Sequence, residues 1–260
     1  MAQDIKLNLE EFLLDISDLH VQYNTDDATV YALNGFNLQV RRGEKLGLVG
    51  ETGAGKTTMA LSVLGLLPEK IGKVTTGCIQ YGADNLLEQT EAFMLGLRGK
   101  RISMIFQDPM TSLNPIVSVG DQIMEVLDLH APDMSQHEKS ERVDRILSMV
   151  GIPPSRKEEF PYQFSGGMKQ RIVIAMALIA EPELLLADEP TTALDVTMQA
   201  QILDMMSRLK QQFNTSVVLI THDLGVVAEF CDRVAVVYAG KVVEQGSVEQ
   251  VFSREQNHPY

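Results

Sequence analysis

The chain has 260 residues, and its 35 acidic against 22 basic side chains give a formal net charge of −13. Because binding to nucleic acid or to anionic lipid needs basic patches, this balance argues against either as a general partner. The longest apolar run, residues 172–180, is too short to cross a membrane, and residues 1–11 lack the pattern of a secretory signal. The sequence therefore predicts a soluble cytoplasmic protein, with any membrane role exerted through a partner.

The first part of the chain predicts a small antiparallel β layer. An apolar strand is expected over residues 12–23. A polar turn and the segment at residues 29–33 follow, and then an antiparallel strand over residues 36–40 before the turn at Arg42-Gly43. Such a layer is more than a bare mononucleotide-binding fold requires, so we expect it to form a subdomain.

A glycine-rich segment follows, between an apolar run at residues 46–49 and a helix-like segment at residues 59–64. Strand, glycine-rich loop and helix form the context in which a G-x-x-x-x-G-K-[ST] pattern binds the phosphates of a nucleoside triphosphate. Glycines allow backbone N–H groups to surround an anion, and the start of the helix adds its positive dipole end. The predicted phosphate-binding residues are Gly50, Glu51, Thr52, Gly53, Ala54, Gly55, Lys56, Thr57 and Thr58.

Two side chains of this loop have specific predicted roles. Lys56 can reach the β- and γ-phosphates, and the hydroxyl group of Thr57 suits Mg²⁺. An aromatic residue of the β layer could stack on the base: Tyr23 is favoured, Tyr31 is the rival, and core packing is the alternative for either. The chain is therefore expected to bind a nucleoside triphosphate.

A strand expected over residues 100–107 ends at Gln107. A glutamine beside a phosphate site could touch Mg²⁺ or the attacking water, and a solvated loop residue is the alternative. Residues 119–180 then show apolar side chains at helical spacing, which predicts a helical insertion whose charged run at residues 137–142 is a solvated face.

Within this insertion, a serine and two glycines precede an apolar helix expected over residues 172–180. The three residues are Ser165, Gly166 and Gly167. A helix that starts in this way can hold an anion at its N-terminus.

The α/β pattern resumes with an apolar strand that ends in Asp188 and Glu189. After a phosphate-binding loop, such an aspartate serves the Mg²⁺ side of the site, and the adjacent glutamate can orient and deprotonate a water molecule. His222 ends the next predicted strand and could hydrogen-bond the γ-phosphate and the same water. Since ligands bind at the carboxyl ends of strands in open parallel sheets, Lys56 is expected to converge with these three side chains.

The remaining pattern predicts a helix over residues 197–212, a hairpin over residues 234–243 and a short helix over residues 248–254. Cys78 and Cys231 are expected to be buried free thiols of a reducing compartment, and neither belongs to a metal-ligand spacing.

The expected fold class is α/β, a P-loop NTPase (RecA-like) core with an antiparallel β subdomain and an inserted helical subdomain. The core with its β subdomain is placed at residues 1–107 and 181–260, and the helical subdomain at residues 108–180.

The ordered motifs resemble those of ABC-type ATPase domains, over nearly the whole chain. The matching elements are the Walker A loop at Gly50–Thr57, Gln107, Ser165-Gly166-Gly167, the Walker B strand ending in Asp188-Glu189, Ala193-Leu194-Asp195, and His222. A finer similarity, to ATPase subunits of oligopeptide, dipeptide and nickel importers, rests on residues 106–115, 164–171 and 258–260. Met168 departs from the glutamine usual in the wider family, and activity is still expected because backbone N–H groups and the Ser165 hydroxyl remain.

This resemblance implies roles for the matched residues. Gln107 corresponds to the Q-loop, Asp195 to the D-loop and Tyr23 to the adenine-stacking aromatic residue. Ser165-Gly166-Gly167 would contact the γ-phosphate held by a second subunit, in a head-to-tail dimer that encloses two ATP molecules. The implied catalytic residues are Glu189, His222, Lys56 and Gln107, and the implied Mg²⁺ ligands are Thr57, Gln107 and Asp188.

The resemblance also implies partners. The chain would be the ATP-hydrolysing motor of an importer of peptides or nickel-type solutes. A second, related ABC ATPase subunit is the favoured dimer partner, and a copy of the same chain is the alternative. Two transmembrane permease subunits would hold it at the cytoplasmic face of the cell membrane, and an extracellular or periplasmic solute-binding protein would act indirectly.

Two other functions compete with this one. A soluble ABC ATPase acting on DNA or the ribosome usually has tandem domains or long insertions and a basic surface. A P-loop kinase or GTPase outside the ABC group would leave Ser165-Gly166-Gly167 and His222 without a purpose. The importer motor is the favoured reading.

Overall fold

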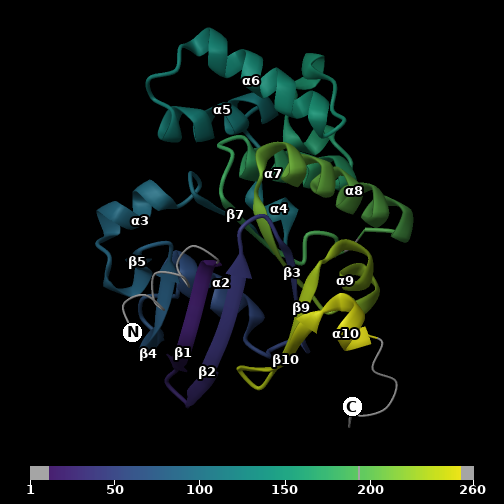
Figure 1. Ribbon diagram of the computed structural model, residues 1–260. Helices are drawn as coiled ribbons and strands as arrows, with labels where there is room; N and C mark the ends of the chain where they lie inside the picture. Colours follow the sequence, from purple (N-terminus) through teal and green to yellow (C-terminus); the bar gives the residue numbers. More distant parts are fainter. Residues whose placement is uncertain (1–11, 193, 253–260) are drawn as a thin grey trace. The chain divides into compact units, whose positions relative to one another are not determined.

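A computed structural model describes residues 12–192 and 194–252 of the chain (Figure 1). The described residues divide into two compact units, one within residues 1–95 and 216–260 (unit 1) and one within residues 96–215 (unit 2). The boundaries expected from the sequence, after residues 107 and 180, concern subdomains and stay a prediction.

Unit 1 contains an antiparallel sheet of four strands in the order β2-β1-β4-β5. The strands are β1 (Phe12–Asn24), β2 (Thr29–Arg41), β4 (Gly72–Tyr81) and β5 (Asp84–Asn85). In Figure 1, β1, β2 and β4 lie side by side. Alternate apolar side chains of this sheet are fully buried, so the period of two that predicted the β layer does line a core.

The segment at residues 29–33 and the strand expected at residues 36–40 belong to one continuous strand, β2. The expected strand was too short, because β2 continues through Gly35. This glycine takes a φ of 77°, and the pairing register of β1 with β2 shifts nearby, between Leu19–Phe36 and His20–Asn34. Such an irregularity bends the ladder without ending it.

The second group of strands in unit 1 has the order β10-β9-β3-β8. Its strands are β3 (Lys45–Val49), β8 (Ser216–Thr221), β9 (Arg233–Tyr238) and β10 (Lys241–Ser247). β3 is parallel to both β8 and β9, whereas β10 pairs with β9 as the predicted antiparallel hairpin. All of β8 and nearly all of β3 are buried, which explains their almost continuous apolar runs.

The helices of unit 1 are short. α2 (Lys56–Leu64) follows β3, and α9 (Leu224–Phe230) follows β8, packing against β3 and β8. α10 (Val248–Phe252) packs beside α9, β9 and β10 (Figure 1). Two further elements, the 3-10 helix η1 (Leu86–Glu88) and α3 (Glu91–Leu97), follow β5 along the chain.

Unit 2 combines a pair of parallel strands, β6 (Ile102–Ile105) and β7 (Leu184–Asp188), with helices. α7 packs against β6, α4, α5, α6 and α8. The elements between and after the two strands are α4 (Pro109–Ser112), α5 (Val119–His130), α6 (Gln136–Met149), η2 (Pro154–Arg156), η3 (Pro161–Gln163), α7 (Gly166–Leu178) and α8 (Val196–Phe213).

This arrangement confirms the predicted α/β class and the helical insertion. The helix expected at residues 172–180 is the later part of α7, and the helix expected at residues 197–212 is α8. In the described parts of the chain, we find no helix with the length and apolar character needed to cross a bilayer.

The two cysteines are free thiols, as expected, but only Cys231 is buried. Cys78 is partly exposed because its side chain lies on one face of β4, whereas that of the next residue, Ile79, lies on the other face and is fully buried. Burial raises the pKa of the Cys231 thiol to about 12. This thiol therefore remains protonated at neutral pH and is an unreactive core residue.

Candidate nucleotide-binding and catalytic site

The predicted phosphate-binding loop connects β3 to α2, and two of its glycines are required by geometry. A Cβ atom on Gly50 would lie 2.3 Å from the carbonyl oxygen of Val237. Gly55 has a φ of 104°, and a Cβ there would lie 2.6 Å from the carbonyl oxygen of Ala32. A larger residue at either position would have to displace backbone of unit 1.

Lys56 folds back across this loop. Its Nζ donates to the carbonyl oxygen of Gly50 at 2.6 Å and to that of Glu51 at 2.9 Å, and the side chain is buried. Gly55, the N-cap residue of α2, supplies no side-chain hydrogen bond, so a side-chain cap does not block the start of the helix. A lysine beside an uncapped helix N-terminus fits a phosphate ligand. Thr57 is exposed in the first helical turn, where a hydroxyl can reach a metal ion.

Residues outside the loop fix its position, and no sequence motif predicts them. The N–H of Gly240 donates to the carbonyl oxygen of Ala54 at 3.0 Å, and the N–H of Asn34 donates to the carbonyl oxygen of Gly240 at 2.9 Å. The β9–β10 turn therefore connects the loop to β2. In the sequence, the only feature that pointed to this contact was the turn itself, and a turn of this kind indicates an ordinary hairpin.

Tyr23 lies beside the start of α2. Its hydroxyl donates to Oγ1 of Thr58 at 3.2 Å, and the side chain is half-buried. Tyr31, in contrast, is 66% exposed. Of the two tyrosines considered for base stacking, Tyr23 is the one that hydrogen-bonds a residue of the phosphate-binding loop.

His222 follows the strand next to β3. Val49, the last residue of β3, pairs in register with Thr221, the last residue of β8. Gly50 and His222 each come directly after one of these strands, so both lie at the same edge of the sheet. His222 is exposed there. The register thus places His222 at the same sheet edge as the phosphate-binding loop, and their convergence on a nucleotide stays a prediction.

Gln107 and Glu189 meet in unit 2. Ile105 pairs with Ala187, so the two side chains follow neighbouring strands at the same edge. Nε2 of Gln107 donates to Oε2 of Glu189 at 3.2 Å, and Oγ1 of Thr192 donates to the same oxygen at 2.8 Å. Asp188, one residue earlier, is buried.

The backbone of Glu189 has a φ of 47°, in the left-handed region that few residues other than glycine adopt. Three residues later, the N–H of Thr192 donates to the carbonyl oxygen of Glu189 at 3.1 Å, so a tight turn begins at Glu189. Such strain persists only where surrounding contacts hold it, and it is concentrated at functional sites.

Ser165 is the N-cap of α7, where its side chain accepts a hydrogen bond from the N–H of Met168. The space around Gly166 is open, because a Cβ there would meet no atom within 4 Å. Met168 accepts a hydrogen bond at its sulfur from Arg156 at 3.6 Å, so this residue packs beside an arginine. The exposed start of α7 retains backbone N–H groups that suit an anion.

Asp195 is the N-cap of α8, and Oδ1 accepts from the N–H of Met198 at 2.9 Å. The methyl end of Met198 lies over Gly167, where an added Cβ would come within 2.3 Å of it. Asp195 and Gly167 are therefore connected through Met198. Ala193 and residues 258–260, which also carry the family resemblance, lie outside the described residues.

The predicted site residues thus form local groups within each unit. Unit 1 brings together Tyr23, the loop residues and His222, and unit 2 brings Gln107 to Glu189. The convergence of Lys56 with Asp188 and Glu189 stays a prediction.

The fold and the loop define the chain as a P-loop nucleotide-binding protein of the α/β class. The ABC transporter family matches residues 33–192. This chain belongs to that family.

Relatives of known function show the same family. The chain is 50% identical to the dipeptide transport ATP-binding protein DppD of Bacillus subtilis over 252 residues, which cover 96% of this chain and 75% of that protein. It is also 50% identical to the oligopeptide transport ATP-binding protein OppD of Salmonella typhimurium over 250 residues, covering 95% and 73%.

Solved structures agree in fold. CbiO1 of Clostridium perfringens, described as part of the ABC transporter complex cbiONQ, has a TM-score of 0.82 at 29% identity and covers 95% of this chain and 92% of its own. The dimeric ATP-binding cassette MJ0796, bound to ADP and Pi, has a TM-score of 0.80 at 27% identity and covers 90% and 98%.

Proposed function

We propose that this chain is the ATP-hydrolysing motor subunit of a membrane ABC importer. The cargo is peptides, of the oligopeptide or dipeptide class, and nickel-type solutes are the alternative cargo. The 50% sequence identity to dipeptide and oligopeptide transport ATP-binding proteins, over most of the chain, supports this choice.

Nucleotide binding is assigned to unit 1. Lys56 offsets the charge of the β- and γ-phosphates, while backbone N–H groups of the loop and of the start of α2 donate to the phosphate oxygens. The ring of Tyr23 stacks on the adenine. Mg²⁺, held with the nucleotide by Thr57, Asp188 and Gln107, would neutralise phosphate charge.

Hydrolysis is assigned to Glu189. Its carboxylate accepts the proton of a water molecule aligned with the γ-phosphate, and the Gln107 amide and the Thr192 hydroxyl orient it through Oε2. His222 donates a hydrogen bond toward the γ-phosphate. Asp195 acts in the loop that borders the second subunit.

The motor works as part of a complex. We propose a head-to-tail dimer in which Ser165, Gly166 and Gly167 contact the nucleotide of a second, related ABC ATPase subunit. Two transmembrane permease subunits hold the dimer at the cytoplasmic face of the membrane, and a solute-binding protein delivers cargo from the other side. Closure of the dimer on ATP and reopening after hydrolysis drive the permease.

One observation carries the proposal most directly. Lys56 spans the loop and contacts the carbonyl oxygens of Gly50 and Glu51 at an uncapped helix start, where a triphosphate can replace both contacts. Because hydrogen bonds to a charged group contribute about 1.5–3 kcal/mol, Lys56→Ala should weaken ATP binding about 10- to 100-fold.

The experiment is a calorimetric titration with Mg-ATP, combined with phosphate release, for wild type, Lys56→Ala and Glu189→Gln. Lys70→Ala, at an exposed lysine of the same unit, is the control and should bind as wild type does. Glu189→Gln should keep ATP affinity while hydrolysis falls by about 10²- to 10⁴-fold, the usual contribution of a general base. Unchanged affinity in Lys56→Ala, or wild-type turnover in Glu189→Gln, would refute the site.

A further inference from the structure

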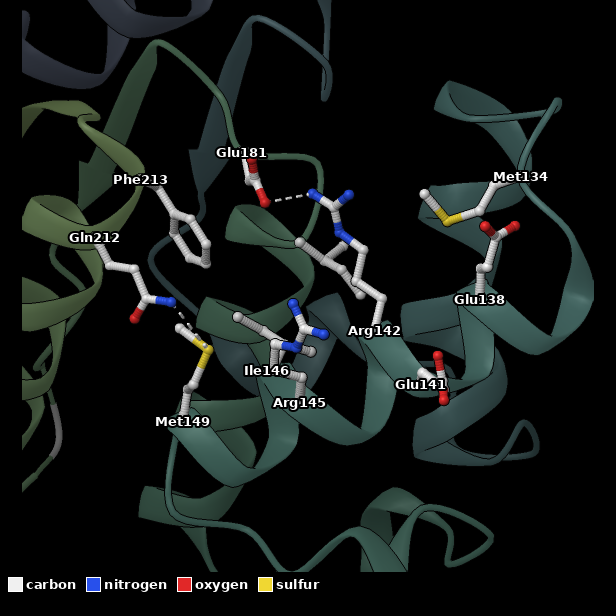
Figure 2. Close-up of a pocket in the computed structure, with 11 residues that line it drawn as sticks. Met134, Glu138, Glu141, Arg142, Arg145, Ile146, Met149, Glu181, Gln212 and Phe213 are labelled. Atoms are coloured by element: carbon white, nitrogen blue, oxygen red, sulfur yellow. Dashed lines mark hydrogen bonds and ion pairs between the residues drawn. The ribbon is translucent and has the colours of Figure 1, made fainter.

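Unit 2 contains a cavity of about 270 Å³ that the nucleotide site does not use. Residues of α6 form much of it, together with the turn after α7 and the end of α8 (Figure 2). The volume lies just below the 300–1,000 Å³ of sites for drug-sized ligands, so a smaller molecule fits it best.

Part of the lining is apolar. Ile146 and Ile179 are buried, and Met149 and Phe213 are partly exposed beside them. Figure 2 shows Phe213 and Met149 from different helices on the same side of the cavity. A branched or aromatic side chain would find a contact surface here that excludes water.

Three of the charged side chains in the lining are already engaged. Arg142 pairs with Glu181 at 2.6 Å, shown as a dashed line in Figure 2. Glu138 belongs to the capping box of α6, where its carboxylate accepts from the N–H of Ser135 at 2.9 Å and from its hydroxyl at 2.7 Å.

Arg145 differs from these residues. It lines the same cavity on α6, next to Ile146, and forms no ion pair with any described residue. Its guanidinium group is charged at all physiological pH values and offers a planar set of N–H donors that matches a carboxylate. This position therefore favours an anionic group of a ligand.

Negative charge lies on the other side of the lining. Glu141 pairs only loosely with the exposed His137, at 3.6 Å, and such surface pairs contribute little. Glu138 keeps acceptor capacity beyond its capping bonds, because an ionised carboxylate has about four lone-pair positions. In Figure 2, Glu138 lies beside Met134, and Glu141 lies farther along α6, toward Arg142. A cationic group is favoured beside these carboxylates.

We propose that this cavity binds a small zwitterion with an apolar side chain, an amino acid or a very short peptide. Arg145 binds its carboxylate, Glu141 and Glu138 bind its ammonium group, and the apolar side chain lies against Met149 and Phe213. The charges and the apolar lining define this ligand class, whereas the choice of peptides as the cellular ligand rests on the proposed function. The imported product would then contact its own motor.

The test is isothermal titration of the nucleotide-free protein with leucyl-leucine, at up to millimolar concentration. Wild type should bind the dipeptide. Leucyl-leucinamide, which lacks the carboxylate, and N-acetyl-leucyl-leucine, which lacks the ammonium group, should each bind at least about tenfold more weakly.

Arg145→Gln should show the same loss for leucyl-leucine and no further loss for the amide, because the removed contact is the same. The control is Arg208→Gln, at an arginine of α8 that is 72% exposed, pairs with Asp204 and lies outside the cavity lining. It should bind as wild type does. Both variants remove an exposed charge, so equal thermal unfolding midpoints would verify that they fold.

Absence of binding to wild type, or equal binding by wild type and Arg145→Gln, would overturn the proposal. The titration contains no nucleotide, so its result does not depend on the ATPase site. A separate titration of the same sample with Mg-ATP shows whether the proposed function fails instead.

Discussion

Tyr23 shows how a single hydroxyl group can affect nucleotide binding. The phenol ring is the proposed base-stacking surface, and its hydroxyl donates to Oγ1 of Thr58, one residue after Thr57 on the first turn of α2. Without this bond the ring would rotate more freely, and stacking would require it to be ordered first. The tyrosine thus links the base-binding position to the phosphate-binding loop.

Tyr23→Phe keeps the ring and removes only this hydrogen bond. Because a neutral hydrogen bond contributes about 0.5–1.5 kcal/mol, we expect ATP affinity to fall about two- to tenfold while the rate of hydrolysis at saturating ATP is unchanged. Thr58→Val should weaken ATP binding less in a Tyr23→Phe background than in wild type, because the hydrogen bond is already absent there. A double-mutant cycle measures this coupling. Tyr31→Phe, at the exposed rival, should have no effect, and a larger loss there would reverse the assignment.

Glu189 and Gln107 show what residue-level sequence reasoning can and cannot reach. Their identities and strand-end positions follow from the chemistry, since a general base and its orienting amide must adjoin the phosphates. Their hydrogen bond joins residues 82 positions apart, and the bond from Tyr23 to Thr58 joins residues 35 positions apart. Local patterns cannot specify such contacts, because they depend on which strands and helices become neighbours.

At the scale of elements, the helices carry their own start signals. Ser165 caps α7, Asp195 caps α8, and Ser135 forms a capping box with Glu138 at the start of α6. The family motifs indicate only a nucleotide-related role for Ser165 and Asp195, and their capping role becomes visible in the structure. Capping residues are also those with accessible oxygen atoms beside free N–H groups, so one residue can serve both purposes.

Asp195 permits the two roles to be separated. Asp195→Ala should lower the free energy of unfolding by about 1 kcal/mol because the N–H of Met198 loses its acceptor. Asp195→Asn should retain most of that stability, since asparagine caps equally well. Urea unfolding measures both variants. If Asp195→Asn nonetheless loses ATPase activity, the carboxylate has a function beyond the cap; equal destabilisation by both variants would contradict the capping argument.

A second element-level contact is sensitive to pH. Lys139 of α6 is buried, and its Nζ donates to Oδ1 of Asp128 on α5 at 2.7 Å. The hydrogen bond from Lys139 holds the pKa of the Asp128 carboxyl group below its usual value. A carboxyl group whose pKa is lower in the folded state stabilises the fold above its unfolded pKa, about 3.9, and loses this contribution as the pH falls through the folded pKa.

Asp128→Asn should therefore lower the urea midpoint at neutral pH, where Lys139 would lack its carboxylate, and should reduce the loss of stability on acidification. Asp204→Asn, which removes an exposed pair with Arg208, is the matched control and should change neither quantity appreciably. Urea titrations between neutral pH and pH of about 3 give both quantities. Equal acid sensitivity of Asp128→Asn and wild type would show that the α5–α6 pair does not contribute.

At the scale of the whole molecule, the fold class was the easiest property to predict. The glycine-rich loop, the buried parallel strands and the helical insertion each have a periodicity or spacing that differs from that of neighbouring segments. The single strand β2 was harder, because Gly35 resembles a turn residue and only pairing with β1 shows that the ladder continues. The apolar and charged cavity of unit 2 was not foreseen, since it combines residues of α6, of α8 and of the turn after α7, which no motif connects.

Assembly is the remaining property of the whole molecule. In the proposed dimer, the start of α7 in one subunit faces the phosphate-binding loop of the other. Two copies of this chain would each carry a formal net charge of −13. Like charge of this size opposes self-association, most strongly at low ionic strength. A related subunit with a different surface charge would avoid that repulsion.

We therefore expect purified Glu189→Gln protein to bind Mg-ATP and remain monomeric, as measured by light scattering after size exclusion. Hydrolysis is blocked in this variant, so any ATP-dependent dimer would accumulate rather than dissociate. Lys56→Ala, which should not hold ATP, is the control for nucleotide-independent association. Wild-type ATPase activity per mole should also stay at a low basal value as protein concentration rises, because no completed site forms between copies. A shift of Glu189→Gln to twice the monomer mass with ATP alone would instead establish that Ser165-Gly166-Gly167 acts on a copy of the same chain, and the heterodimer would no longer be needed to complete the site.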